Sequence, residues 1–171
     1  MKKFIVISLA LVLMVPLSRR QNFRGLDKSP LDMAYFPDNY AHDRRPGDQV
    51  IAKVIYSRPQ RNGRDLFGSL VPFGRVWRTG ANENTEIRFY REVKIGGKTI
   101  EPGSYSLFSI PGEKEWTIIL NKDLDYWGAY RYNQDNDVTR IKVPSKELDK
   151  NVEAFSIQFE KVEDNEAKMQ M

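Results

Sequence analysis

Apolar side chains recur at every second position through most of the chain, and this spacing constrains the fold more than any other feature. In QVIAKVIYS, residues 49–57, the alternating positions Val50, Ala52, Val54 and Tyr56 are apolar or aromatic. Alternation rich in β-branched and aromatic residues is typical of half-buried strands, whereas an amphipathic helix repeats near every 3.6 residues. Similar runs are TEIRFY (85–90), SYSLFSI (104–110), EWTIILN (115–121) and VEAFSIQFE (152–160). The pattern predicts an all-β domain with no long helix.

Short turn signals connect these runs. Gly96-Gly97 stands between two short runs and predicts a two-residue hairpin, because both positions tolerate positive φ. We expect strands 92–95, 98–100 and 104–110 to follow one another as an antiparallel meander, with 115–121 next and a further strand at 138–143. About eight to nine strands predict a single antiparallel β-sandwich that resembles a jelly roll, and a sheet closed on itself is the alternative.

The N-terminus has the layout of a secretory signal peptide. Lys2 and Lys3 precede an apolar run over residues 4–15, which is shorter than the ~20 residues of a membrane-spanning helix. We therefore expect residues 1–18 to be removed on export to the periplasm or the cell surface, leaving no transmembrane span in the mature chain. Retention of this segment as an anchor stays open, because no cleavage site is clearly marked after Ser18.

Composition limits the remaining possibilities. Without residues 1–18, the 171-residue chain keeps 153 residues, the size of one domain, and it has no cysteine, so its core must hold it without disulfides. Removing Lys2 and Lys3 from the 27 basic residues leaves 25 against 23 acidic ones, a net charge of +2, and this near balance argues against a nucleic-acid partner. We expect a flexible tether at 19–28, a β-sandwich domain at 29–160 and a polar tail at 161–171.

Two long segments interrupt the strand pattern, at 58–84 and 122–137, and long connections in compact domains are often functional. The first is rich in glycine and arginine, and arginine binds carboxylates and phosphates; the second is rich in aspartate and in aromatic residues, which stack on sugar rings. The candidate ligand-binding residues are Arg58, Arg64, Trp77, Arg78, Asn82, Glu83, Trp127 and Tyr130. They favour a non-catalytic binding domain for an envelope glycan, an anionic small molecule or an envelope protein.

Other roles for the same residues remain open. Arg78 and Glu83 could form a buried ion pair that holds the loop, with Trp77 closing the end of the sandwich. Glu83 could instead serve a carboxylate-based hydrolase, with Arg78 stabilising a developing anion; the second carboxylate would be Asp65, Asp125 or Asp135. A third alternative is a structural interaction module.

The chain lacks the residues for common nucleophilic and zinc chemistry. It has no cysteine, and its only histidine, His42, lies in a polar stretch that predicts an exposed loop. Asn133, Asp135 and Asp137 resemble the start of a calcium loop, but the expected glycine and distal glutamate are missing, which favours an ordinary Asx-rich turn. We therefore predict no catalytic residue, no metal site and no cofactor.

Several motifs stand in the order found in one bacterial family. YSRP, GRDLFGSLVPFGRVWRTGANENT, GSYSLFSIPG and WGAY occur between residues 29 and 159. On these motifs the chain resembles the exported family catalogued as domain of unknown function 2911. The resemblance implies an exported, all-β domain with no established activity.

Overall fold

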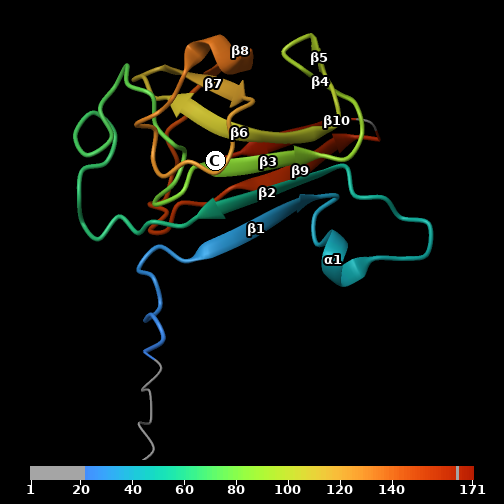
Figure 1. Ribbon diagram of the computed structural model, residues 1–171, viewed down its shortest axis with the longest axis horizontal. Coiled ribbons are helices and arrows are strands. Elements are labelled where there is room, and N and C mark those ends of the chain that lie inside the picture. The colour runs from blue at the N-terminus through green and yellow to red at the C-terminus, as the bar shows by residue number, and fades with distance from the viewer. Residues whose placement is uncertain (1–21, 165) are drawn as a thin grey trace, which may run out of the picture.

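The computed structural model describes residues 22–164 and 166–171, so the expected signal peptide, residues 1–18, and the first three residues of the tether lie outside the described chain. Strands dominate the fold, and the one α-helix, α1, has four residues (Figure 1). The elements are β1 (Leu31–Phe36), α1 (Tyr40–Asp43), β2 (Ala52–Ser57), β3 (Thr85–Phe89), β4 (Val93–Ile95), β5 (Lys98–Ile100), β6 (Gly103–Ile110), β7 (Glu115–Asn121), the 3-10 turn η1 (Gln134–Asn136), β8 (Asp137–Pro144), β9 (Gln158–Glu163) and β10 (Glu166–Gln170). The prediction of an all-β antiparallel fold is confirmed.

One twisted sheet of six strands forms the larger layer, in the order β1-β2-β3-β6-β7-β8. Every neighbouring pair in it is antiparallel, and β1 and β8 are its two edges, so it does not close on itself. The predicted meander is wrong at one step: β5 does not pair with β6. Instead, β3 pairs directly with β6, with Thr85 opposite Leu107, and the β4–β5 hairpin stands apart as a sheet of two strands.

The turn between β4 and β5 is the one that the glycine pair predicts. Gly96 and Gly97 have φ values of 57° and 81°, which a two-residue turn with two left-handed positions requires. Gly96 also lies directly against the side chain of Ile141 on β8, where a Cβ atom would clash. The hairpin is thereby held against the large sheet.

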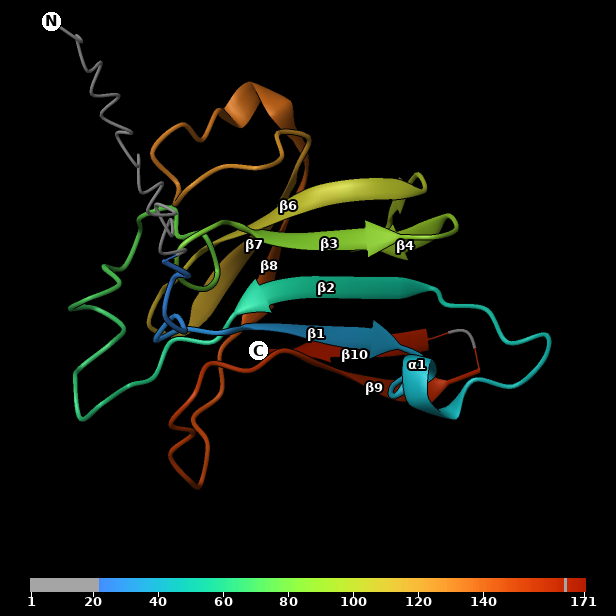
Figure 2. The same cartoon turned by 60° about the horizontal axis from the view of Figure 1, so that its bottom comes forward.

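Two hairpins, β4–β5 and β9–β10, cover one face of the large sheet and give a sandwich-like arrangement (Figure 2). The buried residues between the layers are Phe36, Ala52, Val54, Tyr56, Ile87, Phe89, Ile100, Tyr105, Leu107, Ile118, Leu120 and Ile157. Alternate positions of β2 and β3 point into this core, as the period of two predicts. The face of the sheet that these hairpins cover is therefore predominantly apolar.

The C-terminal segment differs from its predicted form. Residues 161–171 were expected to be a polar tail, but most of them form the end of β9 and all of β10, and Met169 pairs with Phe159 in register. Both side chains pack against the core, which explains why this charged segment is ordered. The predicted strand at 152–160 starts later, at Gln158, although Ile157 is buried as the alternation predicts.

The loops gather mainly at one end of the sandwich. Residues 58–84 and 145–157 lie there beside residues 22–30, which lead into β1, whereas α1 lies at the opposite end (Figure 2). Within residues 22–164 and 166–171, no helix is long and apolar enough to cross a membrane.

Candidate functional site

The two long loops meet beside the start of β3. The amide of Asn84 donates to the carbonyl of Tyr126 at 2.9 Å, and the amide of Gly128 donates to the carbonyl of Asn82, also at 2.9 Å. Between them, Glu83 and Trp127 form an antiparallel bridge. Loop segments 82–84 and 126–128 are thus joined by main-chain bonds, although 43 residues separate Asn84 from Trp127.

We use the name loop junction for Arg78, Asn82, Glu83, Trp127 and Tyr130. The ring of Tyr130 lies against Gly128, at 2.7 Å from where a Cβ atom of that glycine would be. The carbonyl of Arg78 accepts a hydrogen bond from the amide of Thr85 at 3.2 Å, which places Arg78 beside the start of β3. Five of the eight residues predicted from the sequence therefore lie in one region, on two different loops.

Buried polar side chains fix the 122–137 loop on the outer face of the sheet. Asn84 accepts a hydrogen bond from the amide of Tyr126 at 2.7 Å and donates to the hydroxyl of Ser106 at 2.5 Å. The Ser106 hydroxyl donates in turn to the carbonyl of Asp123. Fully satisfied buried networks of this kind hold a loop in one conformation.

The far end of the same loop is held by Asp137. Its carboxylate accepts bonds from Asn121 Nδ2 at 2.8 Å, the Tyr132 hydroxyl at 2.6 Å and Arg140 Nη1 at 2.8 Å. Burial, followed by the hydrogen bond to Asp137, raises the pKa of Tyr132 to about 12. Trp127 and Tyr130 are therefore displayed on a loop whose two ends are both anchored.

Arg78 is the residue of the loop junction whose polar groups are least satisfied. Its side chain is half-buried, and among the described residues its Nε atom, which is buried, has no hydrogen-bond acceptor. Burial lowers the pKa of Arg78 and the neighbouring Tyr130 opposes this shift. Arginine nevertheless stays charged in proteins, so a partly desolvated positive charge lies here.

The expected Arg78–Glu83 ion pair is not formed within the described chain. Glu83 is exposed, because its main chain bridges to Trp127 and leaves the side chain facing solvent. Between the two residues, Thr79 and Asn82 have φ values of 56° and 58°, which turn the chain sharply. Of the alternatives that the sequence left open, the buried clamp through this pair is therefore not the one that is formed.

A strained turn replaces that clamp. Thr79 is fully buried, and positive φ is unusual for a β-branched residue and costs about 1–3 kcal/mol. Its hydroxyl donates to Ser109 Oγ at 2.9 Å, and its carbonyl accepts from Thr85 Oγ1 at 2.6 Å. Backbone strain persists only where the surroundings determine the conformation, and such positions cluster at functional sites.

Trp77 lies inside an aromatic cluster and not on the surface of the loop junction. Its main chain exchanges two hydrogen bonds with Ser109, and its indole nitrogen donates to the carbonyl of Gly80 at 3.1 Å. The ring contacts three others edge-on: Phe155 at 5.3 Å, Phe67 at 6.0 Å and Trp116 at 6.2 Å between centroids. Trp77 therefore fills the end of the sandwich by packing against these rings.

Arg58 and Arg64, also candidate ligand residues, have internal partners. Arg58 donates to Asp32 at 2.9 Å, to the Phe155 carbonyl at 3.0 Å and to Ser156 Oγ at 2.8 Å, and so ties β1 to the segment before β9. Arg64 donates to the carbonyls of residues 60 and 61 within its own turn. Neither side chain reaches the loop junction through these contacts.

Asn82 makes one side-chain contact outside the loops. Its Nδ2 atom donates to Asp27 Oδ1 at 2.9 Å, and a bond from the Ser29 amide to the same carboxylate comes first among the causes that lower the pKa of Asp27. This part of the predicted tether is therefore attached to the edge of the loop junction.

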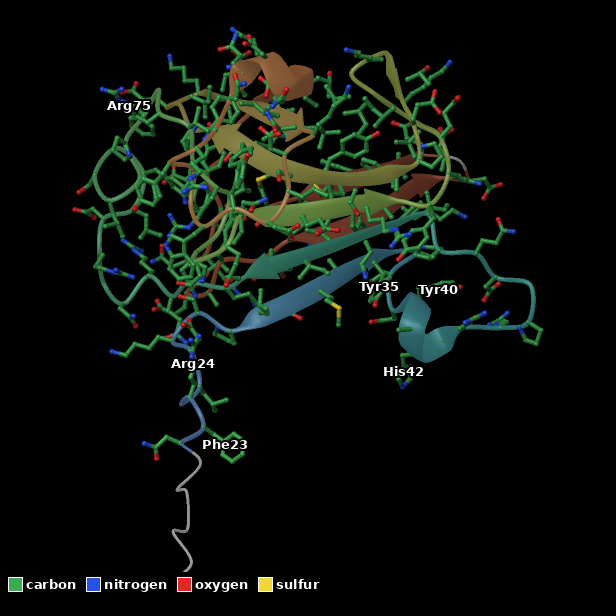
Figure 3. All side chains as sticks on the ribbon, in the orientation of Figure 1. Phe23, Arg24, Tyr35, Tyr40, His42 and Arg75 are labelled. Atoms are coloured by element: carbon green, nitrogen blue, oxygen red, sulfur yellow. The ribbon has the colours of Figure 1, made fainter. Side chains whose placement is uncertain are left out.

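The residues considered for metal binding or for nucleophilic chemistry do not form a site in the described chain. Asn133 Oδ1 accepts from the amide of Asp135 at 3.0 Å, the Asx turn that the sequence favours. No group of three or more histidine, aspartate or glutamate side chains is arranged to hold a metal ion in residues 22–164 and 166–171. His42 is exposed on α1, far from the loops (Figure 3), and its bond to Asp43 raises its pKa.

Two residues that organise this region escaped the sequence analysis. Asn84 and Asn121 are buried and hold the 122–137 loop, but short polar side chains in such positions look like ordinary turn residues in a sequence. Their place at the start and end of strongly apolar strands was the available signal.

Comparison with curated proteins and with solved structures found no significant match. A family model described as "Protein of unknown function (DUF2911)" matches residues 41–171, from within α1 to Met171. This match covers more than half of the chain, so the protein belongs to that family.

Proposed function

We propose that this protein is an exported, non-catalytic binding domain that takes an acidic glycan at the loop junction. The observation that carries the proposal is the half-buried guanidinium of Arg78, whose buried Nε atom has no acceptor in the described chain. A buried donor without a partner costs about 1–3 kcal/mol, and more when it is charged. A carboxylate or phosphate bound at the accessible part of this guanidinium would compensate its partly desolvated charge.

Two aromatic side chains favour a glycan over a bare anion. Trp127 is 60% exposed and Tyr130 is 86% exposed, although both belong to an anchored loop. Rings of this kind stack on the apolar faces of sugars while their polar atoms remain in water. The exposed carboxylate of Glu83 can accept hydrogen bonds from sugar hydroxyl groups.

Export is part of the proposal and rests on the N-terminal sequence. Lys2, Lys3 and the apolar run over residues 4–15 support recognition by a secretion pathway. Fractionation of cells that produce the full chain should recover it outside the cytoplasm. Recovery only in the soluble cytoplasmic fraction would contradict this part.

Binding is tested with oligogalacturonate as the probe, a neutral cello-oligosaccharide as its uncharged counterpart, and inorganic phosphate. Only Trp127 of the three tryptophans belongs to the loop junction, so its fluorescence should report the glycan and Trp127→Phe should remove the signal. We expect Arg78→Gln to weaken oligogalacturonate binding by about 10- to 100-fold, from the ~1.5–3 kcal/mol of a charged hydrogen bond. The matched control is Arg91→Gln, an exposed arginine with the same change in charge.

The proposal fails if Arg78→Gln binds like Arg91→Gln, or if oligogalacturonate and the neutral oligosaccharide bind equally. If phosphate binds and neither oligosaccharide does, an anion site at Arg78 remains supported, but a glycan is excluded as its ligand. Stability supplies a separate measurement: Arg78→Met keeps the apolar stem and removes the unsatisfied charge, so it should leave stability unchanged or raise it by about 1 kcal/mol. A loss of several kcal/mol would instead assign Arg78 a structural role.

A further inference from the structure

The tip of the 58–84 loop exposes large apolar side chains although it is folded. The exposed members are Phe67, Leu70 and Phe73. The tip is held by main-chain bonds from Gly68 to the carbonyl of Val71 at 2.9 Å and from Val71 to the carbonyl of Leu66 at 2.8 Å. An ordered loop that presents apolar groups to water marks an interaction surface.

The two chain segments at this end are rich in basic residues. Segments 22–30 and 61–78 contain Arg24, Lys28, Arg61, Arg64, Arg75 and Arg78, against Asp27 and Asp65. Six positive charges minus two negative ones give +4, whereas the whole chain from residue 19 onward has +2, so the rest of that chain has −2. These two segments are therefore net positive, whereas segment 145–157 at the same end (Figure 2) has Lys146 and Lys150 against Glu147, Asp149 and Glu153, a net charge of −1.

Among the described residues, no salt bridge joins Arg61, Arg64 or Arg75 to a carboxylate, although the carboxylate of Glu153 accepts from the Asn62 amide at 2.7 Å. Arg61 donates to the Arg64 carbonyl and to the Asn151 amide oxygen, and Arg64 donates to main-chain carbonyls. These acceptors are neutral. Arg75 is exposed on the same loop, as Figure 3 shows.

This end is also where the described chain begins. Arg58 donates its amide to the carbonyl of Pro30 at 3.0 Å, so residues 22–30 start beside the loop. Residues 16–21 connect them to the apolar run 4–15, and an extended chain of this length reaches roughly 20 Å. While the apolar run is in a membrane, this end of the domain is the part nearest to it.

We propose that this end, residues 22–31 together with 61–78, docks on a bilayer of anionic phospholipid. Leu70 and Phe73 enter the headgroup region, and Arg61, Arg64 and Arg75 contact lipid phosphates. An anionic surface attracts basic residues with about 1 kcal/mol each, and buried apolar groups add to this. The order of the tip limits the conformational entropy lost on docking.

The absence of cysteine makes a position-specific test clean. Leu70→Cys in the full chain receives an environment-sensitive fluorophore, and Val162→Cys on β9 is the matched control, since Leu70 is 56% exposed and Val162 is 53% exposed. Each protein is mixed with phosphatidylglycerol/phosphatidylcholine vesicles or with pure phosphatidylcholine vesicles. We expect a blue shift at position 70 only, only with phosphatidylglycerol, and reversed by high salt.

A second comparison tests the arginines. Arg61→Gln, Arg64→Gln and Arg75→Gln together, in the Leu70→Cys background, should raise the amount of anionic lipid needed for the shift by about tenfold or more. The control removes the same charge elsewhere, with Arg91→Gln, Lys94→Gln and Lys122→Gln, and circular dichroism verifies that both variants fold. Unchanged fluorescence at position 70, equal shifts at 70 and 162, or equal shifts with both kinds of vesicle would each overturn the proposal.

Discussion

Asn121, the last residue of β7, offers the sharpest test of how the loop junction is held. It is fully buried. Its Nδ2 atom donates to the Asn133 carbonyl at 2.9 Å and to Asp137 Oδ1 at 2.8 Å, and its Oδ1 atom accepts from the Asp123 amide at 2.8 Å. Asn121→Ala therefore releases both ends of the 122–137 loop at once.

The expected loss of stability follows from these three bonds. A hydrogen bond contributes a net ~0.5–1.5 kcal/mol, and one to a charged group ~1.5–3 kcal/mol, as for Asp137 here. Asp123 and Asn133 are also left with polar groups that lack their partner. We expect Asn121→Ala to lower the free energy of unfolding by about 3–5 kcal/mol, a large part of the ~5–15 kcal/mol of a typical domain.

Urea denaturation, followed by circular dichroism, measures this change. Asn151→Ala is the control, because Asn151 is exposed and accepts one hydrogen bond, from Arg61, so its loss should stay below about 1 kcal/mol. Equal slopes against urea for both variants show that the comparison is between similar unfolding reactions. A loss at Asn121 no larger than that at Asn151 would refute the view that this side chain anchors the loop.

Three further comparisons test separate features. Arg58→Ala should lower stability by about 2–3 kcal/mol in thermal or urea unfolding, because the side chain loses three hydrogen-bond partners. Arg64→Ala, which loses only exposed bonds within its own turn, should cost less than about 1 kcal/mol. Equal losses would contradict the view that Arg58 ties β1 to the segment before β9. The pKa of Tyr132 is raised from 10.0 to about 12 in the folded protein, so the unfolded chain loses this proton at lower pH, and stability should fall as the pH rises through that interval. Tyr132→Phe should lack this fall. The same pH dependence in both proteins would contradict the raised pKa of Tyr132. Gly96→Ala should lower the free energy of unfolding by more than Gly97→Ala. Both positions have positive φ, which costs about 1–2 kcal/mol for alanine, but only a Cβ atom at position 96 would clash with a side chain of β8. Equal losses would show that the clash does not contribute.

Alternation predicts the local part of this fold well because burial on one face is a property of each strand alone. Val54 and Ile87 are buried where the period of two places them. Which strands pair is a property of the whole chain, and here the direct pairing of β3 with β6 was missed. The β10 strand was missed as well, because Met169 is one apolar residue in a charged segment and finds its partner Phe159 only after folding.

The candidate site shows the same division. Its location on two long loops could be predicted, since arginine and aromatic residues are concentrated there. The meeting of segments 82–84 and 126–128 could not, because main-chain hydrogen bonds have no side-chain pattern. The sequence could not decide whether Arg78 and Glu83 form an ion pair. The positive φ values of Thr79 and Asn82, which set the geometry of the turn between them, cannot be read from a threonine and an asparagine.

The closure of the core by its C-terminal hairpin has a consequence for when the protein can fold. Tyr56 donates to the carbonyl of Ile157, 101 residues further along the chain, and Arg58 reaches Phe155 across 97. Until residues 155–170 have been made and delivered, the apolar face of β2 and β3 has no cover there. Chains dominated by such distant contacts fold slowly. Because the core cannot close without its C-terminal residues, the chain should stay unfolded until those residues are available. This property would suit transport through a channel that accepts only unfolded polypeptide.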